Sequence, residues 1–103
     1  MTIKATKYYP MKAIWNNQVI AESDRTITLE DNVYFPPDSL IKKYFIESLT
    51  HTICHWKGVA SYYSVVVEGD ENLDAAWFYP DPSPKAKQIR HYVAFWKGVT
   101  ISE

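Results

Sequence analysis

The sequence contains a single cysteine and few glycines, and each shortage excludes a kind of structure or chemistry. One thiol, that of Cys54, cannot form a disulfide within the chain. The three glycines are Gly58, Gly69 and Gly98, and none lies in a GxGxxG or P-loop pattern. A glycine-rich cradle for phosphate groups is therefore not expected.

The sequence also lacks an excess of charge and a long apolar run. Eleven basic and 12 acidic residues leave a net charge of -1, too small a field to attract nucleic acid or a membrane surface. No apolar run approaches the roughly 20 residues that span a bilayer, and the opening letters MTIKATKYYPMK lack the apolar segment of a secretory signal. We expect a soluble cytoplasmic protein with no nucleic-acid partner, no membrane partner and no cofactor.

Aromatic residues are abundant instead, with four Trp and eight Tyr among 103 residues. An apolar content of 47% is sufficient for one folded core, and large rings can line a ligand pocket as well as fill a core. The chain length favours a single domain over residues 11–103. Residues 1–10, which end at a proline, are expected to form a flexible leader.

Short strands separated by polar pairs predict a mainly β fold. Asn16-Asn17 and Asp31-Asn32 are typical of two-residue hairpin turns, so residues 11–35 are predicted to form a four-stranded meander. Two short helices are expected as well. FPPDSLIKKYF places apolar residues on one helical face, and Ser83-Pro84 is typical of a helix start.

The longest strand pattern, VASYYSVVVEGDENLDAAWFY, predicts a hairpin around the turn GDEN. That turn places Glu68 opposite Leu73. Because directly opposed residues project from the same side of a sheet, the pairing gathers several polar and aromatic side chains on one face. They are Tyr62, Ser64, Trp77 and Tyr79.

The combination Trp-Lys-Gly occurs twice, at 56–58 and at 96–98. Glycine after lysine permits a positive φ, so each copy is predicted to mark a bend at a corner of the sheet. Lysine is difficult to bury, and each ammonium is expected at the rim with its stem along the ring. If the two bends lie close together, the lysines flank one aromatic pocket, which suits a small anionic or aromatic ligand. The predicted ligand-binding residues are Lys57, Lys97, Trp56, Trp96, Tyr62, Trp77 and Tyr79. The alternative is that these rings only fill a core.

Two further groups of residues could carry chemistry. Cys54 lies near Lys57 in sequence, and a nearby ammonium favours a reactive thiolate, although a buried small apolar side chain is the favoured interpretation. His51, Cys54 and His55 lie within five residues, and His91 could join them. A metal site needs about four well-placed ligands, so no metal is predicted.

Four segments resemble the signature blocks of a small bacterial family catalogued as domain of unknown function 427, which is also labelled a nucleotidyltransferase family. They are YFPPDSL, CHWKGVASYYSV, AAWFYPDPSPKAKQI and YVAFWKGV, and the resemblance runs from about Lys12 to Ile101. It implies twisted antiparallel sheets in a β-tent-like arrangement, similar to zinc-dependent exchange factors and methionine sulfoxide reductases. The chain departs from the family pattern at Cys54-His55, where the family has Cys-Pro, and at Asn17, where it commonly has Gly.

The family label also implies nucleotidyl transfer, but the residues give little support for it. Such chemistry normally needs carboxylates that hold magnesium and a phosphate cradle. The two CxxC pairs that would hold zinc in the tent-fold relatives are absent, so zinc is not carried over. Three classes of function remain open: a small-ligand-binding module, an enzyme acting on nucleotides or through Cys54, and a partner-binding module such as a homodimer.

Overall fold

The chain is built of antiparallel strands in three sheets. A computed structural model describes residues 3–7 and 10–103. One three-stranded sheet has the order β1 (Ile3–Lys7), β4 (Thr26–Leu29), β5 (Asn32–Tyr34). The second has the order β10 (Thr100–Ser102), β2 (Met11–Trp15), β3 (Gln18–Ser23). The four-stranded sheet, called the upper sheet here, has the order β6 (Phe45–Cys54), β7 (Gly58–Val67), β8 (Asp70–Phe78), β9 (Val93–Phe95). The predicted mainly β class is confirmed, and the tent-like arrangement stays a prediction.

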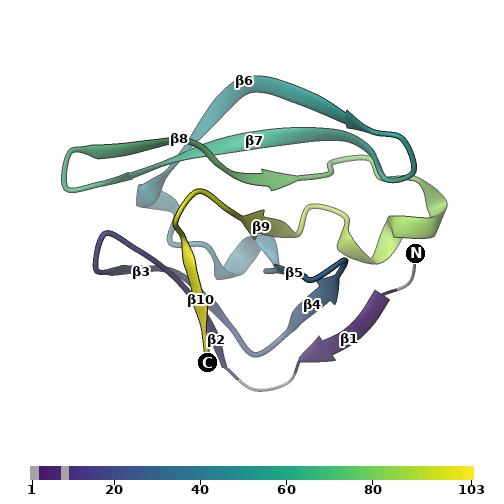
Figure 1. The fold of residues 1–103 in the computed structure, drawn as a ribbon, viewed down its shortest axis with the longest axis horizontal. Coiled ribbons are helices and arrows are strands. Elements are labelled where there is room, and N and C mark those ends of the chain that lie inside the picture. The colour runs from purple at the N-terminus through teal and green to yellow at the C-terminus, as the bar shows by residue number, and fades with distance from the viewer. Residues whose placement is uncertain (1–2, 8–9) are drawn as a thin grey trace.

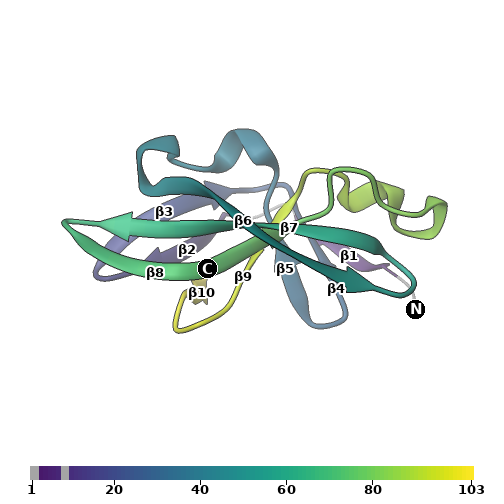
Figure 2. The same cartoon turned by 90° about the horizontal axis from the view of Figure 1, so that it is seen from above.

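The upper sheet extends across both smaller sheets, with β2 and β3 beneath one end and β4 and β5 beneath the other (Figures 1 and 2). Each end has its own apolar core. One core joins β2 and β3 to the upper sheet, and Tyr63 packs against it. The other joins β4 and β5 to the upper sheet, and Tyr62 packs against it. Since successive side chains of a strand point to opposite faces, the upper sheet packs opposite faces onto the two cores.

Two hydrogen bonds tie β9 to the smaller sheet that contains β5. The backbone N–H of Phe35 donates to the carbonyl of Val93 at 2.8 Å, and the N–H of Val93 donates back at 2.8 Å. Both residues are buried. This bridge holds the end of β5 directly beneath the upper sheet, where the candidate site is found.

Of the two predicted hairpin turns, the first lies where it was predicted and the second is shifted by one residue. Asn16 and Asn17 have φ values of 53° and 62°, as a two-residue primed turn requires. In the second hairpin the positive φ values fall on Glu30 and Asp31, one residue earlier than predicted. The predicted four-stranded meander is wrong, because β2-β3 and β4-β5 belong to different sheets.

The two predicted helices are not α-helices. In their place, the described residues contain three short 3-10 segments, η1 (Pro37–Ser39), η2 (Lys42–Tyr44) and η3 (Pro84–Ile89). Leu40 and Ile41 are extended, and the N–H of Ile41 donates to the carbonyl of Ile20 at 2.9 Å. The backbone N–H of Ile41 is therefore bonded to the edge strand β3 and is not available for a continuous helix. In η3, a non-helical Ala86 interrupts the segment.

The predicted register of the β7-β8 hairpin is wrong by two residues at its far end. The turn residues are Glu68 and Gly69, with φ values of 49° and 82°, and Tyr62 pairs with Trp77 rather than with Tyr79. An irregularity between Tyr63 and Val65 shifts the pairing along the hairpin. Because the shift at this end is an even number of residues, Tyr62 and Trp77 still share one face, as predicted.

The predicted N-terminal leader includes described residues. Within it, Ile3–Lys7 form β1, which pairs with β4. Positions 1–2 and 8–9 lie outside the described residues, and the flexibility of the leader stays a prediction. Among the helical segments that the structure describes, none has the length and apolar character needed to cross a membrane.

Candidate functional site

A cavity of about 190 Å³ lies where the upper sheet meets its two Trp-Lys-Gly bends. Its lining residues come from the β6-β7 turn, β7, β8 and the segments that follow β8 and β9. They are Lys57, Tyr62, Trp77, Tyr79 and Trp96. Tyr62 and Trp77 are directly paired, and Tyr79 lies two positions beyond Trp77 on the same side. Five of the seven predicted ligand-binding residues are thus brought around one space.

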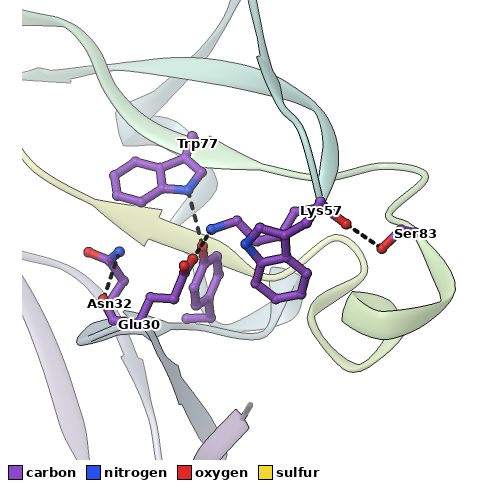
Figure 3. A network of polar contacts seen from close by, with 7 residues as sticks. Glu30, Asn32, Lys57, Trp77 and Ser83 are labelled. Atoms are coloured by element: carbon purple, nitrogen blue, oxygen red, sulfur yellow. Dashed lines mark hydrogen bonds and ion pairs between the residues drawn. The ribbon is translucent and has the colours of Figure 1, made fainter. Parts of the chain in front are cut away.

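Lys57 is buried, with 7% of its surface exposed, and its ammonium forms an ion pair with the Glu30 carboxylate (Figure 3). The Lys57 Nζ also lies 5.3 Å from the ring centroid of Trp56 and 5.6 Å from that of Tyr79. The expectation that this lysine lies at an exposed rim is wrong. Burial is possible because Glu30 supplies the opposite charge and two aromatic faces surround the cation.

The pair stabilises the charged forms of both groups. The hydrogen bond from Lys57 lowers the pKa of Glu30 against the opposing effect of burial, and an indole hydrogen bond from Trp56 lowers it further. Burial alone would lower the pKa of Lys57, but the hydrogen bond to Glu30 and nearby groups outweigh it and leave the Lys57 pKa raised. Both groups are therefore ionised at neutral pH.

The backbone around Lys57 is fixed by the segment that precedes η3. The N–H of Ser83 donates to the Lys57 carbonyl at 2.9 Å, and the Ser83 hydroxyl donates to the Trp56 carbonyl at 2.6 Å (Figure 3). Gly58 has a φ of +118°, and a Cβ there would lie 3.3 Å from the Asp81 carbonyl oxygen. The first Trp-Lys-Gly copy therefore needs its glycine both for conformation and for this close approach.

Tyr34 forms a buried polar contact behind the cavity wall. The Trp77 indole N–H donates to the Tyr34 hydroxyl at 3.3 Å, and the two rings meet edge to face at 6.3 Å between centroids. Burial raises the pKa of both Tyr34 and Tyr79, so their hydroxyls stay protonated at neutral pH. The neutral Tyr79 hydroxyl is hydrogen-bonded to Cys54.

The second Trp-Lys-Gly copy contributes its ring but not its lysine. Trp96 is 48% exposed and meets Trp77 edge to face at 6.0 Å, and its indole N–H donates to the Asp74 carbonyl at 2.6 Å. The Lys97 ammonium donates to the Leu73 carbonyl at 2.9 Å and lies 5.1 Å from the Trp96 ring centroid. Neither Lys97 nor Trp56 is among the residues that line the cavity. The prediction that both lysines flank the opening is therefore wrong for Lys97.

Cys54 is a free, half-buried thiol that packs against the core between β4, β5 and the upper sheet. His51, three positions earlier on β6, hydrogen-bonds the Ser61 hydroxyl through its Nδ1 at 3.3 Å. Odd and even positions of a strand point to opposite faces, so the two side chains diverge. Within the described part of the chain, no group of three or more His, Cys, Asp or Glu side chains is placed to hold a metal ion.

Sequence reasoning missed Glu30 and Tyr34. Glu30 is 27 positions from Lys57, and it was taken only as a hairpin residue beside a turn. No local pattern in the sequence identifies Glu30 as the partner. A lysine next to a core does need a carboxylate nearby, but that carboxylate can come from anywhere in the chain. Tyr34 gave no signal beyond its place in a strand.

A larger hollow of about 540 Å³ lies beside η1 and η2 and was not predicted. Charged side chains of Asp38, Lys42 and Glu47 surround the rings of Phe45 and Tyr63 there. None of these five residues is buried. The smaller cavity is the better candidate site, because it contains a buried cation with a defined partner.

The comparisons with known proteins place the chain in a family without giving its activity. A family model described as Domain of unknown function (DUF427), with the label NTP_transf_9, matches residues 4–102. None of the curated proteins matches the chain. The family match covers nearly the whole chain and includes every residue of the candidate site, and so this chain belongs to the DUF427 family.

Proposed function

We propose that this protein binds a small planar molecule in the cavity lined by Lys57, Trp77 and Trp96. The observation that carries the proposal is the space itself. The rings there do not close around one another, and they leave an open hollow of about 190 Å³ beside a buried ammonium. A pocket that joins apolar rings to a few fixed polar groups is typical of small-molecule sites.

The size and the lining favour a single ring or a small fused ring. The cavity is smaller than the roughly 300–1,000 Å³ of sites for drug-sized ligands. Trp77 and Trp96 offer ring surface, and Lys57 offers hydrogen-bond donors. The five lining residues include no carboxylate that would hold magnesium, so this lining gives no support to nucleotidyl transfer.

Saturation-transfer NMR with a panel of heteroaromatic compounds tests the proposal, using nicotinamide, uracil, adenine and indole as probes. Trp96→Ala is the informative variant, because its ring is half exposed and its loss opens no hole in the core. We expect an affinity about tenfold lower, since one aromatic contact contributes about 0.5–1.5 kcal/mol. Leu49→Ala, at a side chain that is 96% exposed on β6, is the matched control and leaves binding unchanged. Equal binding by Trp96→Ala and wild type would sink the proposal.

A specific observation also favours a second candidate, pairing of two copies along β6. This ten-residue strand is at the end of its sheet, and it exposes Ile46, Leu49 and Ile53 by 52%, 96% and 82%. Exposed apolar strands at a sheet edge are prone to pair with another strand. An antiparallel pairing of two copies centred on Leu49 places Glu47 of each opposite His51 of the other.

The mass of the protein in solution, measured by light scattering, tests this second candidate. We expect a dimer at high concentration that Leu49→Asp converts to a monomer, because the substitution places like charges at the centre of the interface. Glu22→Ala, an exposed change on β3, is the control. A strictly monomeric wild type would contradict the pairing.

A further inference from the structure

The charge of the cavity limits the ligands that it can hold. Lys57 is the only charged residue among the described residues that line it. Its ammonium is already matched by the Glu30 carboxylate, so the pair as a whole is neutral. The second lysine, Lys97, directs its ammonium to the Leu73 carbonyl instead. The cavity therefore presents a hydrogen-bonding cation without a net positive charge.

We infer that the ligand is uncharged: a flat heteroaromatic ring with a carbonyl oxygen or ring nitrogen that accepts a hydrogen bond from Lys57. This inference rests on the proposed function and narrows the proposed ligand from planar molecules in general to uncharged ones. An ammonium has three N–H donors, and Glu30 accepts one of them, so donors remain for a ligand. The Tyr62 hydroxyl is bonded to the Thr52 hydroxyl at 2.8 Å and the Tyr79 hydroxyl is bonded to Cys54, which leaves Lys57 as the polar group that orients the ring.

An anionic ligand would meet an obstacle at the same place. Its carboxylate would share one ammonium with Glu30, and two anions at one cation repel each other. Binding of a carboxylate is therefore expected to be weaker, or to be accompanied by uptake of a proton by one of the two carboxyl groups. A neutral acceptor meets no such cost and keeps the Lys57–Glu30 pair intact.

Probe pairs that share a ring and differ in charge test the inference. Nicotinamide and nicotinate share a pyridine ring and differ by an amide against a carboxylate, and orotate is uracil with an added carboxylate. Titration of the wild-type protein at pH 7.5 is expected to give at least about tenfold tighter binding for the neutral member of a pair. Tighter binding of the carboxylates overturns the inference but leaves the proposed pocket standing. Binding by no member of any pair overturns both.

The variant Glu30→Gln provides a second test, because it removes the negative charge of Glu30 and leaves the positive charge of Lys57 without a counter-charge. We expect this variant to reverse the preference and bind the carboxylate member of each pair more tightly. Glu22→Gln, an identical exchange at an exposed position of β3, keeps the wild-type preference. A Glu30→Gln protein that is folded by circular dichroism and still prefers the neutral probes contradicts the role given to Glu30. If that variant does not fold, the wild-type titration decides the inference.

Discussion

Removing the ammonium of Lys57 tests whether the buried ion pair holds the site together. Lys57→Met keeps most of the apolar stem and leaves Glu30 without its partner. Breaking a fully buried pair costs about 3–5 kcal/mol, and an exposed pair contributes about 0–1 kcal/mol. The side chains of Lys57 and Glu30 are 8% and 23% exposed, which places this pair closer to the buried limit. We therefore expect a loss of about 2–3 kcal/mol in the free energy of unfolding, which follows from those limits.

Urea denaturation followed by circular dichroism measures this change, and the melting temperature is expected to fall by about 10–15 °C. The double variant Lys57→Met/Glu30→Gln removes both charges and is expected to recover about half of the loss. Lys97→Met is the matched control in the other Trp-Lys-Gly copy, and it is expected to cost under about 0.5 kcal/mol because Lys97 is exposed. A Lys57→Met protein as stable as the control, or a double variant no more stable than the single one, would refute the reasoning.

The Lys57–Glu30 pair also predicts how the stability of the protein depends on pH. The pKa of Glu30 is lowered from its ordinary value of 4.5, so its contribution is present above pH 4.5 and is lost as pH falls below it. The pKa of Lys57 is raised above 10.5, so its contribution is complete below pH 10.5 and is lost as pH rises through the raised value. The stability difference between wild type and Lys57→Met is therefore expected to be constant between these limits and to shrink in acid.

Two other predictions concern glycine and tyrosine. Gly58→Ala is expected to cost about 3 kcal/mol and Gly98→Ala about 1 kcal/mol, because only the first Cβ meets a backbone atom within 4 Å. Equal losses in thermal denaturation would contradict this close approach. Burial raises the pKa of Tyr34, Tyr63 and Tyr79 above 10.0, so stability is complete below pH 10 and falls above it. In an absorbance titration these three tyrosines are expected to ionise at higher pH than an exposed tyrosine does, and full ionisation of all tyrosines in the folded state near pH 10 would contradict the raised pKa values.

The sequence was sufficient to predict features that depend only on neighbouring residues, such as turns and the alternation of side chains along a strand. Asn16-Asn17 tolerates positive φ, and its turn lies where the pattern predicts it. The face shared by Tyr62, Trp77 and Tyr79 was predicted correctly although the register was not, because the error was an even number of residues. Alternation along a strand is thus a more robust signal than the exact pairing of its residues.

Features set by distant partners were not predictable. The helix expected at 37–45 is interrupted in its middle, because the Ile41 N–H donates to the Ile20 carbonyl on an edge strand. The burial of Lys57 depends on Glu30, which a different hairpin brings beneath the upper sheet. No window of the sequence contains both members of either pair. Composition could indicate an aromatic pocket, but its charge balance required the assembled fold.

The indole N–H signals of the four tryptophans test the central claim most directly, because all four are observed in one NMR spectrum. Trp77 and Trp96 line the cavity, whereas Trp15 packs against the other core and serves as the internal control. On addition of a neutral heteroaromatic such as nicotinamide, we predict that the Trp77 and Trp96 signals shift in a saturable way and that the Trp15 signal stays in place. Equal shifts of Trp15, or no shift of Trp77 and Trp96 with any probe of the panel, would contradict the claim.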